Sequence, residues 1–158
     1  MTEHPPRDAP VVTPRAPVPT EGDIPVRVRY PECDPMGVAH HAAHPIWLEI
    51  ARTELLRRSG VSYRDLEADG VFLVVVRLEM NYRRPARYDD ELIVRCAVTG
   101  GSSVKLIHEY TIRREGADDP PGGTVICEAS SVLACVGRDG KVRQLPAWLT
   151  HRARSEPA

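Results

Sequence analysis

This sequence lacks a surplus of charge of either sign and lacks any long hydrophobic run. Its 158 residues carry 21 Lys and Arg against 22 Asp and Glu, for a formal net charge of -1. Without a basic surplus there is no electrostatic footprint for nucleic acid or for an anionic membrane. No apolar stretch approaches the roughly 18–20 residues that cross a bilayer. We therefore expect no nucleic-acid partner and no membrane span.

The cysteines lack the spacing of a metal-binding or redox pair. Cys33, Cys96, Cys127 and Cys135 form no Cys-x-x-Cys motif. The N-terminus also lacks the hydrophobic core of a secretory signal. These absences predict a cytoplasmic protein with reduced and mostly buried thiols.

The length fits one domain, with proline-rich sequence ahead of it. Hydrophobic residues make up 42% and charged residues 27% of the chain, as in soluble globular proteins. Seven prolines fall in the first 25 residues among charged and polar neighbours. We predict a disordered Pro-rich tail over residues 1–24, a folded domain over 25–150 and a flexible C-terminal tail over 151–158.

The first half of the expected domain combines a strand, a loop and a helix. Residues 26–30 alternate as a strand does, and the prolines and glycine of 31–44 indicate a loop. Pro45 suits the first turn of a long helix that ends at Ser59-Gly60. This helix is apolar around much of its circumference, which predicts that other structure encloses it. A short helix over 63–68, capped by Ser62, is expected next.

Period-two patterns dominate the rest of the chain. They predict strands over 72–82, 92–98, 104–112 and 124–136, with a loop over 115–123. Antiparallel strands that follow one long helix indicate an α+β fold in which the sheet curls around the helix.

The segment from Tyr30 to His44, YPECDPMGVAHHAAH, places a carboxylate shortly before a helix start. Asp34 stands in this loop with Pro35 and Gly37. A helix start offers unpaired N–H groups and the positive end of a dipole. A carboxylate near such donors can attack a polarised carbonyl or activate water against it. The same residues also fit an ordinary capped turn.

Two motifs carry a resemblance to a known family. The run CDPMGVAHH, followed by a helix with Trp47-Leu-Glu and Ala51-Arg-Thr-Glu54, resembles the 4-hydroxybenzoyl-CoA thioesterase family of hotdog-fold acyl-CoA thioesterases. Residues 75–92 look like the family's second sheet segment, and Leu145-Pro146 matches its end. The resemblance implies a hotdog fold, a long central helix wrapped by a five- or six-stranded antiparallel sheet. It also implies homodimers joined edge to edge, often paired into homotetramers, with sites at the subunit interface.

The resemblance also implies roles for individual residues. Asp34 corresponds to the catalytic nucleophile or general base, and the backbone N–H of His41 to the oxyanion donor. The expected substrate-binding residues are Tyr30, Gly37, Val38, Trp47, Arg83, Arg84 and Arg87. The arginines suit the phosphates of coenzyme A. The substrate is an acyl-CoA or acyl-carrier-protein thioester, with no cofactor beyond the coenzyme A of the substrate. Ala43 and His44 depart from the family, many members of which carry Asn and then an aromatic residue there.

Other roles for these side chains are weaker. His40, His41 and His44 lack an acidic or Cys partner at metal-binding spacing, so no metal is expected. Glu49 offers an alternative helix-borne carboxylate, but an ion pair with Arg52 or Arg77 is preferred. Cys33 is expected to be a small buried thiol rather than a nucleophile.

Two other functions are kept as alternatives to thioester hydrolysis. One is a hotdog dehydratase or hydratase, although the longer motif of such enzymes is missing. The other is a non-catalytic acyl-CoA-binding protein, against which the retention of Asp34 argues.

Overall fold

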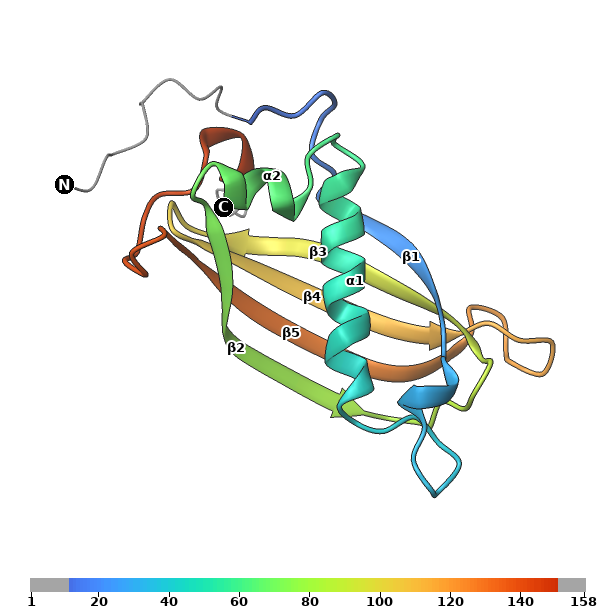
Figure 1. The fold of residues 1–158 in the computed structure, drawn as a ribbon. Coiled ribbons are helices and arrows are strands. Elements are labelled where there is room, and N and C mark those ends of the chain that lie inside the picture. Colours follow the sequence, from blue (N-terminus) through green and yellow to red (C-terminus); the bar gives the residue numbers. More distant parts are fainter. Residues whose placement is uncertain (1–11, 151–158) are drawn as a thin grey trace, which may run out of the picture.

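Five antiparallel strands form one sheet in the computed structural model, which describes residues 12–150 (Figure 1). Their order across the sheet is β1-β3-β4-β5-β2, so β1 and β2 are the two edges. The strands are β1 (Glu21–Arg27), β2 (Phe72–Tyr82), β3 (Glu91–Gly101), β4 (Lys105–Arg114) and β5 (Thr124–Val136). The bounds of β2 and β5 agree with those expected from the period-two pattern.

One long helix lies across a face of this sheet (Figure 1). Helix α1 (Ala43–Arg57) packs mainly against β1 and β3, and the short α2 (Tyr63–Ala68) follows it. Ser62 caps α2 as expected, because its side chain accepts the Asp65 N–H and the Asp65 carboxylate accepts the Ser62 N–H. The predicted α+β arrangement, a long helix against a five-stranded antiparallel sheet, is confirmed. No helix among residues 12–150 is both long and apolar enough to cross a membrane.

The apolar side chains form two groups along α1. Around its first half, Trp47, Leu48 and Ala51 meet the buried faces of β1, β3, β4 and β5. Around its last turn, Leu56 packs with Leu66 of α2 and with residues near the C-terminal end of the described chain. The helix therefore has one core at its start and another at its end.

The folded domain begins earlier in the chain than the sequence predicted. Strand β1 begins at Glu21, inside the segment 1–24 that was assigned to a disordered tail. Pro25 obscured the strand in the sequence, yet β1 is an edge strand, where a missing N–H is tolerated. Ahead of it, the Arg15 N–H donates to the Ser59 carbonyl at 2.8 Å. Residues 1–11 and the predicted tail over 151–158 lie outside the described residues.

Candidate active site

Asp34 occupies a tight hairpin turn just before α1. The Asp34 N–H donates to the Val38 carbonyl at 3.0 Å, and the Gly37 N–H donates to the Asp34 carbonyl at 2.9 Å. Gly37 has a φ of 74°, which side chains with a Cβ adopt only with strain. The Asp34 Oδ1 accepts the Met36 N–H at 2.9 Å. Its second oxygen, Oδ2, has no hydrogen-bond partner within residues 12–150 and is free to face a ligand.

Helix α1 begins at Ala43, two residues before Pro45, and has no side-chain cap from its N-cap residue, Ala42. The His40 side chain supplies the missing acceptor instead, because its Nδ1 accepts the Ala42 N–H at 3.1 Å. The His40 carbonyl accepts the Ala43 N–H at 2.9 Å. The N–H of His41, the residue after His40, donates to no group in the described part of the chain. An unpaired N–H at the positive end of α1 is suited to bind a developing oxyanion.

The structure brings the segment that follows β2 beside this turn. The Ala39 N–H donates to the Ala86 carbonyl at 2.7 Å. The Tyr82 hydroxyl, at the end of β2, donates to the His41 carbonyl at 3.2 Å. The two sequence motifs, some forty residues apart, therefore form one surface.

Of the predicted phosphate-binding arginines, two have free guanidinium groups. Arg83 pairs with Glu128 at 2.8 Å, so its charge is already partly satisfied. Arg84 and Arg87 are exposed and form no ion pair with any residue in the range 12–150. They are placed beside the Asp34 hairpin by the Ala39–Ala86 hydrogen bond.

The remaining predicted pocket residues differ in accessibility. Tyr30 is 79% exposed and its ring meets the Tyr88 ring edge-on at 5.5 Å. Gly37 is exposed and Val38 is half-buried. Trp47 is fully buried in the core, where its ring packs against His44 at 4.7 Å. In a single chain, Trp47 is therefore a packing residue.

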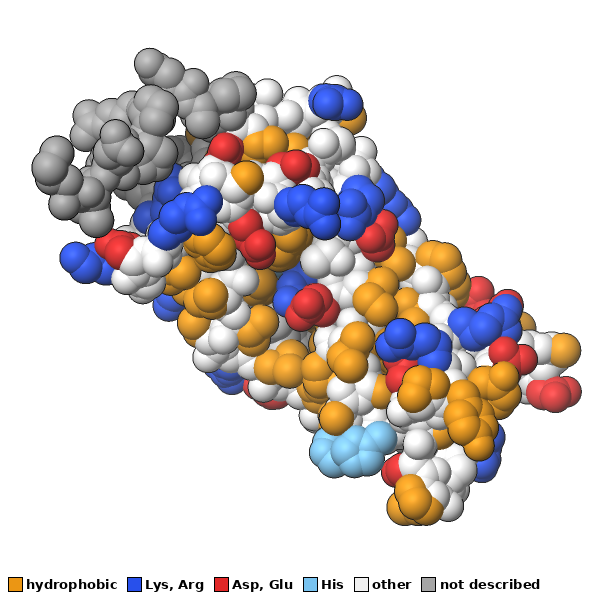
Figure 2. All heavy atoms as spheres, in the orientation of Figure 1, with side chains coloured by type: hydrophobic (Ala, Val, Ile, Leu, Met, Phe, Trp, Pro, Cys, Tyr) orange, Lys and Arg blue, Asp and Glu red, His pale blue; other side chains and the backbone are white. Residues whose placement is uncertain are grey.

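Of the three histidines near the start of α1, His40 is the one whose side chain accepts a hydrogen bond there. Figure 2 shows histidine side chains grouped on the surface at one end of the molecule, next to hydrophobic ones. His44 is buried, and its burial lowers the pKa of the imidazole. No group of three or more His, Cys, Asp or Glu side chains in residues 12–150 is placed to hold a metal ion.

The other candidate nucleophiles are a carboxylate that forms an ion pair and thiols that differ in burial. Glu49 forms the expected ion pair with Arg52, at 3.2 Å. All four cysteines are free thiols, and three of them are buried. Cys33 is half-buried, so the expectation that it is a buried thiol is wrong. Burial raises the pKa of Cys96 to about 12 and that of Cys127 to about 11. Such thiols stay protonated near neutral pH and are poor nucleophiles.

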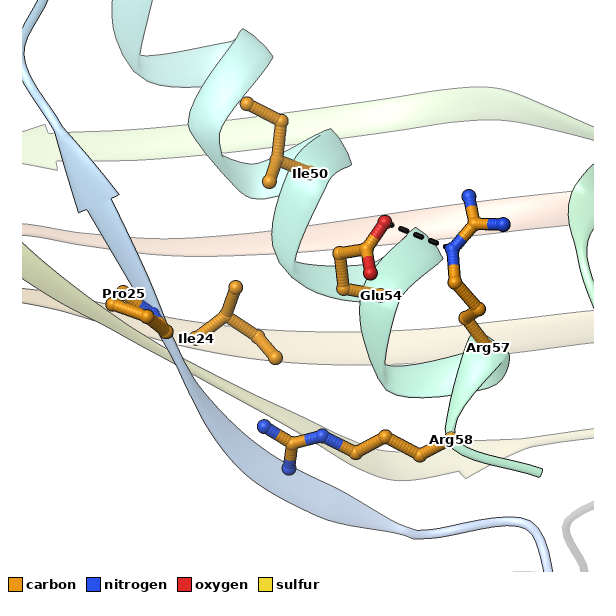
Figure 3. A pocket seen from close by; sticks show the side chains of 6 residues that line it. All are labelled: Ile24, Pro25, Ile50, Glu54, Arg57 and Arg58. Carbon is orange, nitrogen blue, oxygen red and sulfur yellow. Dashed lines mark hydrogen bonds and ion pairs between the residues drawn. The ribbon is translucent and has the colours of Figure 1, made fainter. Parts of the chain in front are cut away.

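A separate hollow of about 470 Å³ lies between the second half of α1 and β1 (Figure 3). It is lined by Ile24, Pro25, Ile50, Glu54, Arg57 and Arg58. Glu54 and Arg57 pair with each other on the α1 side of the hollow, at 3.0 Å (Figure 3). None of its lining residues comes from the Asp34 hairpin or the helix start, so this hollow is distinct from the candidate site.

Sequence reasoning missed three residues that shape this site. Tyr82 was assigned only to a strand, His40 was considered only as a metal ligand, and Glu32 had no predicted role. Tyr82 and Glu32 act through hydrogen bonds to residues that are distant in the sequence, the His41 carbonyl and the Trp47 indole N–H. His40 acts through a hydrogen bond to its near neighbour Ala42. For His40 alone a signal existed, because the helix start offers no Ser, Thr, Asp or Asn as its N-cap.

Comparisons with known proteins identify the family of this chain. A family model of the thioesterase-like superfamily matches residues 28–153. The putative acyl-CoA thioesterase YneP of Bacillus subtilis is 31% identical over 114 residues, which are 72% of this chain and 78% of that protein. The acyl-CoA thioester hydrolase YbgC of Escherichia coli is 36% identical over 112 residues, covering 71% of this chain and 79% of YbgC.

Solved structures resemble the fold over most of its length. The DHNA-CoA thioesterase of Staphylococcus aureus superposes with a TM-score of 0.72 at 28% identity, covering 79% of this chain and 80% of that one. The 4-hydroxybenzoyl CoA thioesterase of a Pseudomonas species has a TM-score of 0.71 at 19% identity, with 82% and 96% covered. This second likeness supports the hotdog fold alone.

Proposed function

The chain belongs to the thioesterase-like superfamily and is a thioester hydrolase, and we propose on that premise that it cleaves acyl-CoA thioesters with Asp34 as the catalytic carboxylate. The observation that carries the proposal is that two polar groups near the start of α1 have no hydrogen-bond partner among residues 12–150. One is the Asp34 Oδ2, and the other is the His41 N–H at the start of α1. An acyl transfer needs a carboxylate and an oxyanion donor of this kind.

Two chemical routes fit these groups. In the first, Asp34 attacks the thioester carbonyl, the C–S bond breaks, coenzyme A leaves as its thiolate, and water then hydrolyses the mixed anhydride. In the second, Asp34 takes a proton from water, which attacks the carbonyl directly. Both routes consume one water and yield a free acid and a thiol. In both, the His41 N–H binds the carbonyl oxygen as negative charge develops on it.

Arg84 and Arg87 are proposed to bind the phosphates of coenzyme A. Both guanidinium groups are exposed and unpaired among the described residues, and both follow the strand that ends beside His41. Arginine binds phosphate oxygens through paired N–H donors and needs no enclosed cavity for this. Arg83 is a weaker candidate because Glu128 already occupies its guanidinium group.

A second copy of the chain is proposed to cover the free edge of β2. This edge strand exposes Val74, Val75, Val76 and Leu78. An exposed apolar edge strand is a template for pairing with another strand, and pairing with its own copy gives a closed two-fold dimer. Tyr82 lies on the same strand and binds the His41 carbonyl, so the dimer edge leads directly into the candidate site. Light scattering of the purified protein, compared with Leu78→Lys, tests this assembly.

The proposed function is tested by thiol release from a panel of acyl-CoAs and acyl-carrier-protein thioesters. We expect wild-type protein to release free thiol from at least one acyl-CoA. The Asp34→Asn variant is expected to bind the same substrate and to release almost none. Equal hydrolysis by both proteins excludes Asp34 as the catalyst. Binding without cleavage of any thioester by the wild type favours a non-catalytic acyl-CoA-binding protein instead.

A further inference from the structure

Glu32 is a buried carboxylate that the proposed mechanism does not use. It ends a single 3₁₀ turn, Tyr30–Glu32, two residues before Asp34. Its side chain is only 6% exposed, although it carries a formal charge. Burying a charged carboxylate costs free energy unless hydrogen-bond donors surround it. The donors around Glu32 therefore show which groups hold it in place.

Four donors converge on the Glu32 carboxylate. The Arg29 side chain donates to Oε1 from Nε at 3.0 Å and from Nη2 at 2.6 Å, and the Arg29 N–H donates to Oε2 at 2.7 Å. The fourth donor is the Trp47 indole N–H, 3.1 Å from Oε1. Burial alone raises the pKa of Glu32, but these hydrogen bonds outweigh it and leave the pKa below its ordinary value. The group is therefore an anion at neutral pH.

The backbone of Glu32 reaches the other side of the hairpin. Its carbonyl accepts the His40 N–H at 2.8 Å, and the next residues, Cys33 and Ala39, form an isolated β-bridge. The Glu32–His40 bond therefore closes the base of the hairpin whose tip carries Asp34. His40 is also the residue that caps α1 and that directly precedes the His41 N–H.

Glu32 thus connects the two groups on which hydrolysis depends. Its carbonyl holds the hairpin of Asp34 to the segment of His41, and its carboxylate holds the same turn to the body of α1 through Trp47. Trp47 is fully buried, so it gives the turn a rigid anchor. A misplacement of about 1 Å between reacting groups can lower a rate by about 10²-fold.

We propose that Glu32 is a positioning residue that fixes the Asp34 carboxylate relative to the oxyanion-binding N–H at the start of α1, acting through Trp47. The proposal rests on the proposed function. The chain offers a comparison in Glu54, which also pairs with an arginine three residues away, at 3.0 Å. The Glu54 side chain is 43% exposed, and no hydrogen bond or ion pair among residues 12–150 joins it to the hairpin.

The experiment compares Glu32→Gln, Trp47→Phe, the double variant and the control Glu54→Gln in steady-state thiol release. Glutamine keeps the shape of Glu32 but turns one acceptor oxygen into a donor that faces other donors. We expect kcat of Glu32→Gln to fall about 10- to 100-fold while KM stays within about threefold. Trp47→Phe is expected to lower kcat about threefold, because one of four donors is lost. Glu54→Gln is expected to keep wild-type kcat.

Unfolding curves of each variant set an assay temperature at which all molecules are folded, so that a purely structural role leaves kcat unchanged. In the double variant, a kcat equal to that of Glu32→Gln shows that the two residues act as one unit, whereas additive losses overturn the link through Trp47. Unchanged kcat in folded Glu32→Gln overturns the inference. If Glu32→Gln does not fold, Trp47→Phe decides alone, and an unchanged kcat there also overturns it. A wild-type protein that cleaves no thioester refutes the proposed function itself, a result distinct from all of these.

Discussion

The two ends of α1 are held to the sheet by different interactions. Around the start of the helix, the hairpin of Asp34 and the turn of His40 are joined to their surroundings mainly by hydrogen bonds. Around its end, Leu56 and Leu66 belong to a cluster of buried apolar side chains. Both ends also pack on apolar side chains, since Ala43 and Trp47 near the start are buried in the first apolar group. The first end differs in that it carries the exposed hairpin, whereas the second is followed by α2 (Figure 1).

This difference separates chemistry from stability. Unpaired polar groups near a helix start are available to a ligand, but they contribute little to the free energy of unfolding. Buried leucines near the helix end stabilise the fold through the apolar surface they remove from water. Substitutions at the two ends should therefore change different observables, which the following predictions test.

The largest effect is expected at Asp34. Asp34→Asn keeps the Oδ1 acceptor for the Met36 N–H but removes the charge that attacks the carbonyl or takes a proton. We expect kcat for thiol release to fall about 10²–10⁴-fold. The free energy of unfolding in urea should change by less than about 0.5 kcal/mol, since no packing is lost. A large loss of stability would place Asp34 among the structural residues instead.

The opposite result is expected for Leu66→Ala in α2. Leu66 is 1% exposed, and its truncation leaves a cavity in the second apolar cluster. The free energy of unfolding should fall by about 2–5 kcal/mol. The kcat of the folded fraction should remain that of the wild type. A drop in kcat comparable to that of Asp34→Asn would show that the two ends are not independent.

A smaller effect is expected from the free arginines at the catalytic end. Arg84→Ala and Arg87→Ala should each raise KM for acyl-CoA about three- to tenfold, because a phosphate ligand is lost. Arg64, an exposed arginine on α2 at the other end, provides the control. The difference should shrink at high salt, which screens exposed charges. Equal KM values for the variants and for Arg64→Ala would remove the phosphate site from this surface.

The smallest effect concerns the cap of α2. Ser62→Ala removes the side chain that accepts the Asp65 N–H at 3.2 Å. Urea denaturation should show a loss of about 1 kcal/mol with unchanged kcat. A change below about 0.3 kcal/mol would mean that Asp65 alone satisfies the end of this helix.

Much of the fold could be predicted from the sequence because its signals are local. The alternation of 72–82 and 124–136 fixes strands, and Ser62 with Asp65 fixes the start of α2. The edge position of β1 is a property of the whole sheet, so Pro25 obscured the start of that strand. Local patterns carry no information about which strands are edges.

The candidate site was predictable only as far as its motifs reach. Asp34, His41 and the arginines follow from the resemblance, and the expected pairing of Glu49 with Arg52 follows from their helical spacing. The roles of Glu32 and Tyr82 depend on contacts between distant segments, with Trp47 and with the His41 carbonyl. Such contacts exist only in the folded chain, and no periodicity in the sequence marks them.

The central claim, that Asp34 performs the chemistry at the start of α1, is tested most directly by a single-turnover experiment. Protein in excess over a cleavable acyl-CoA isolates the chemical step from product release. We predict that wild-type and Asp34→Asn proteins both bind the acyl-CoA and that only the wild type releases thiol within the first turnover. Release of thiol by Asp34→Asn at the wild-type rate would contradict the account.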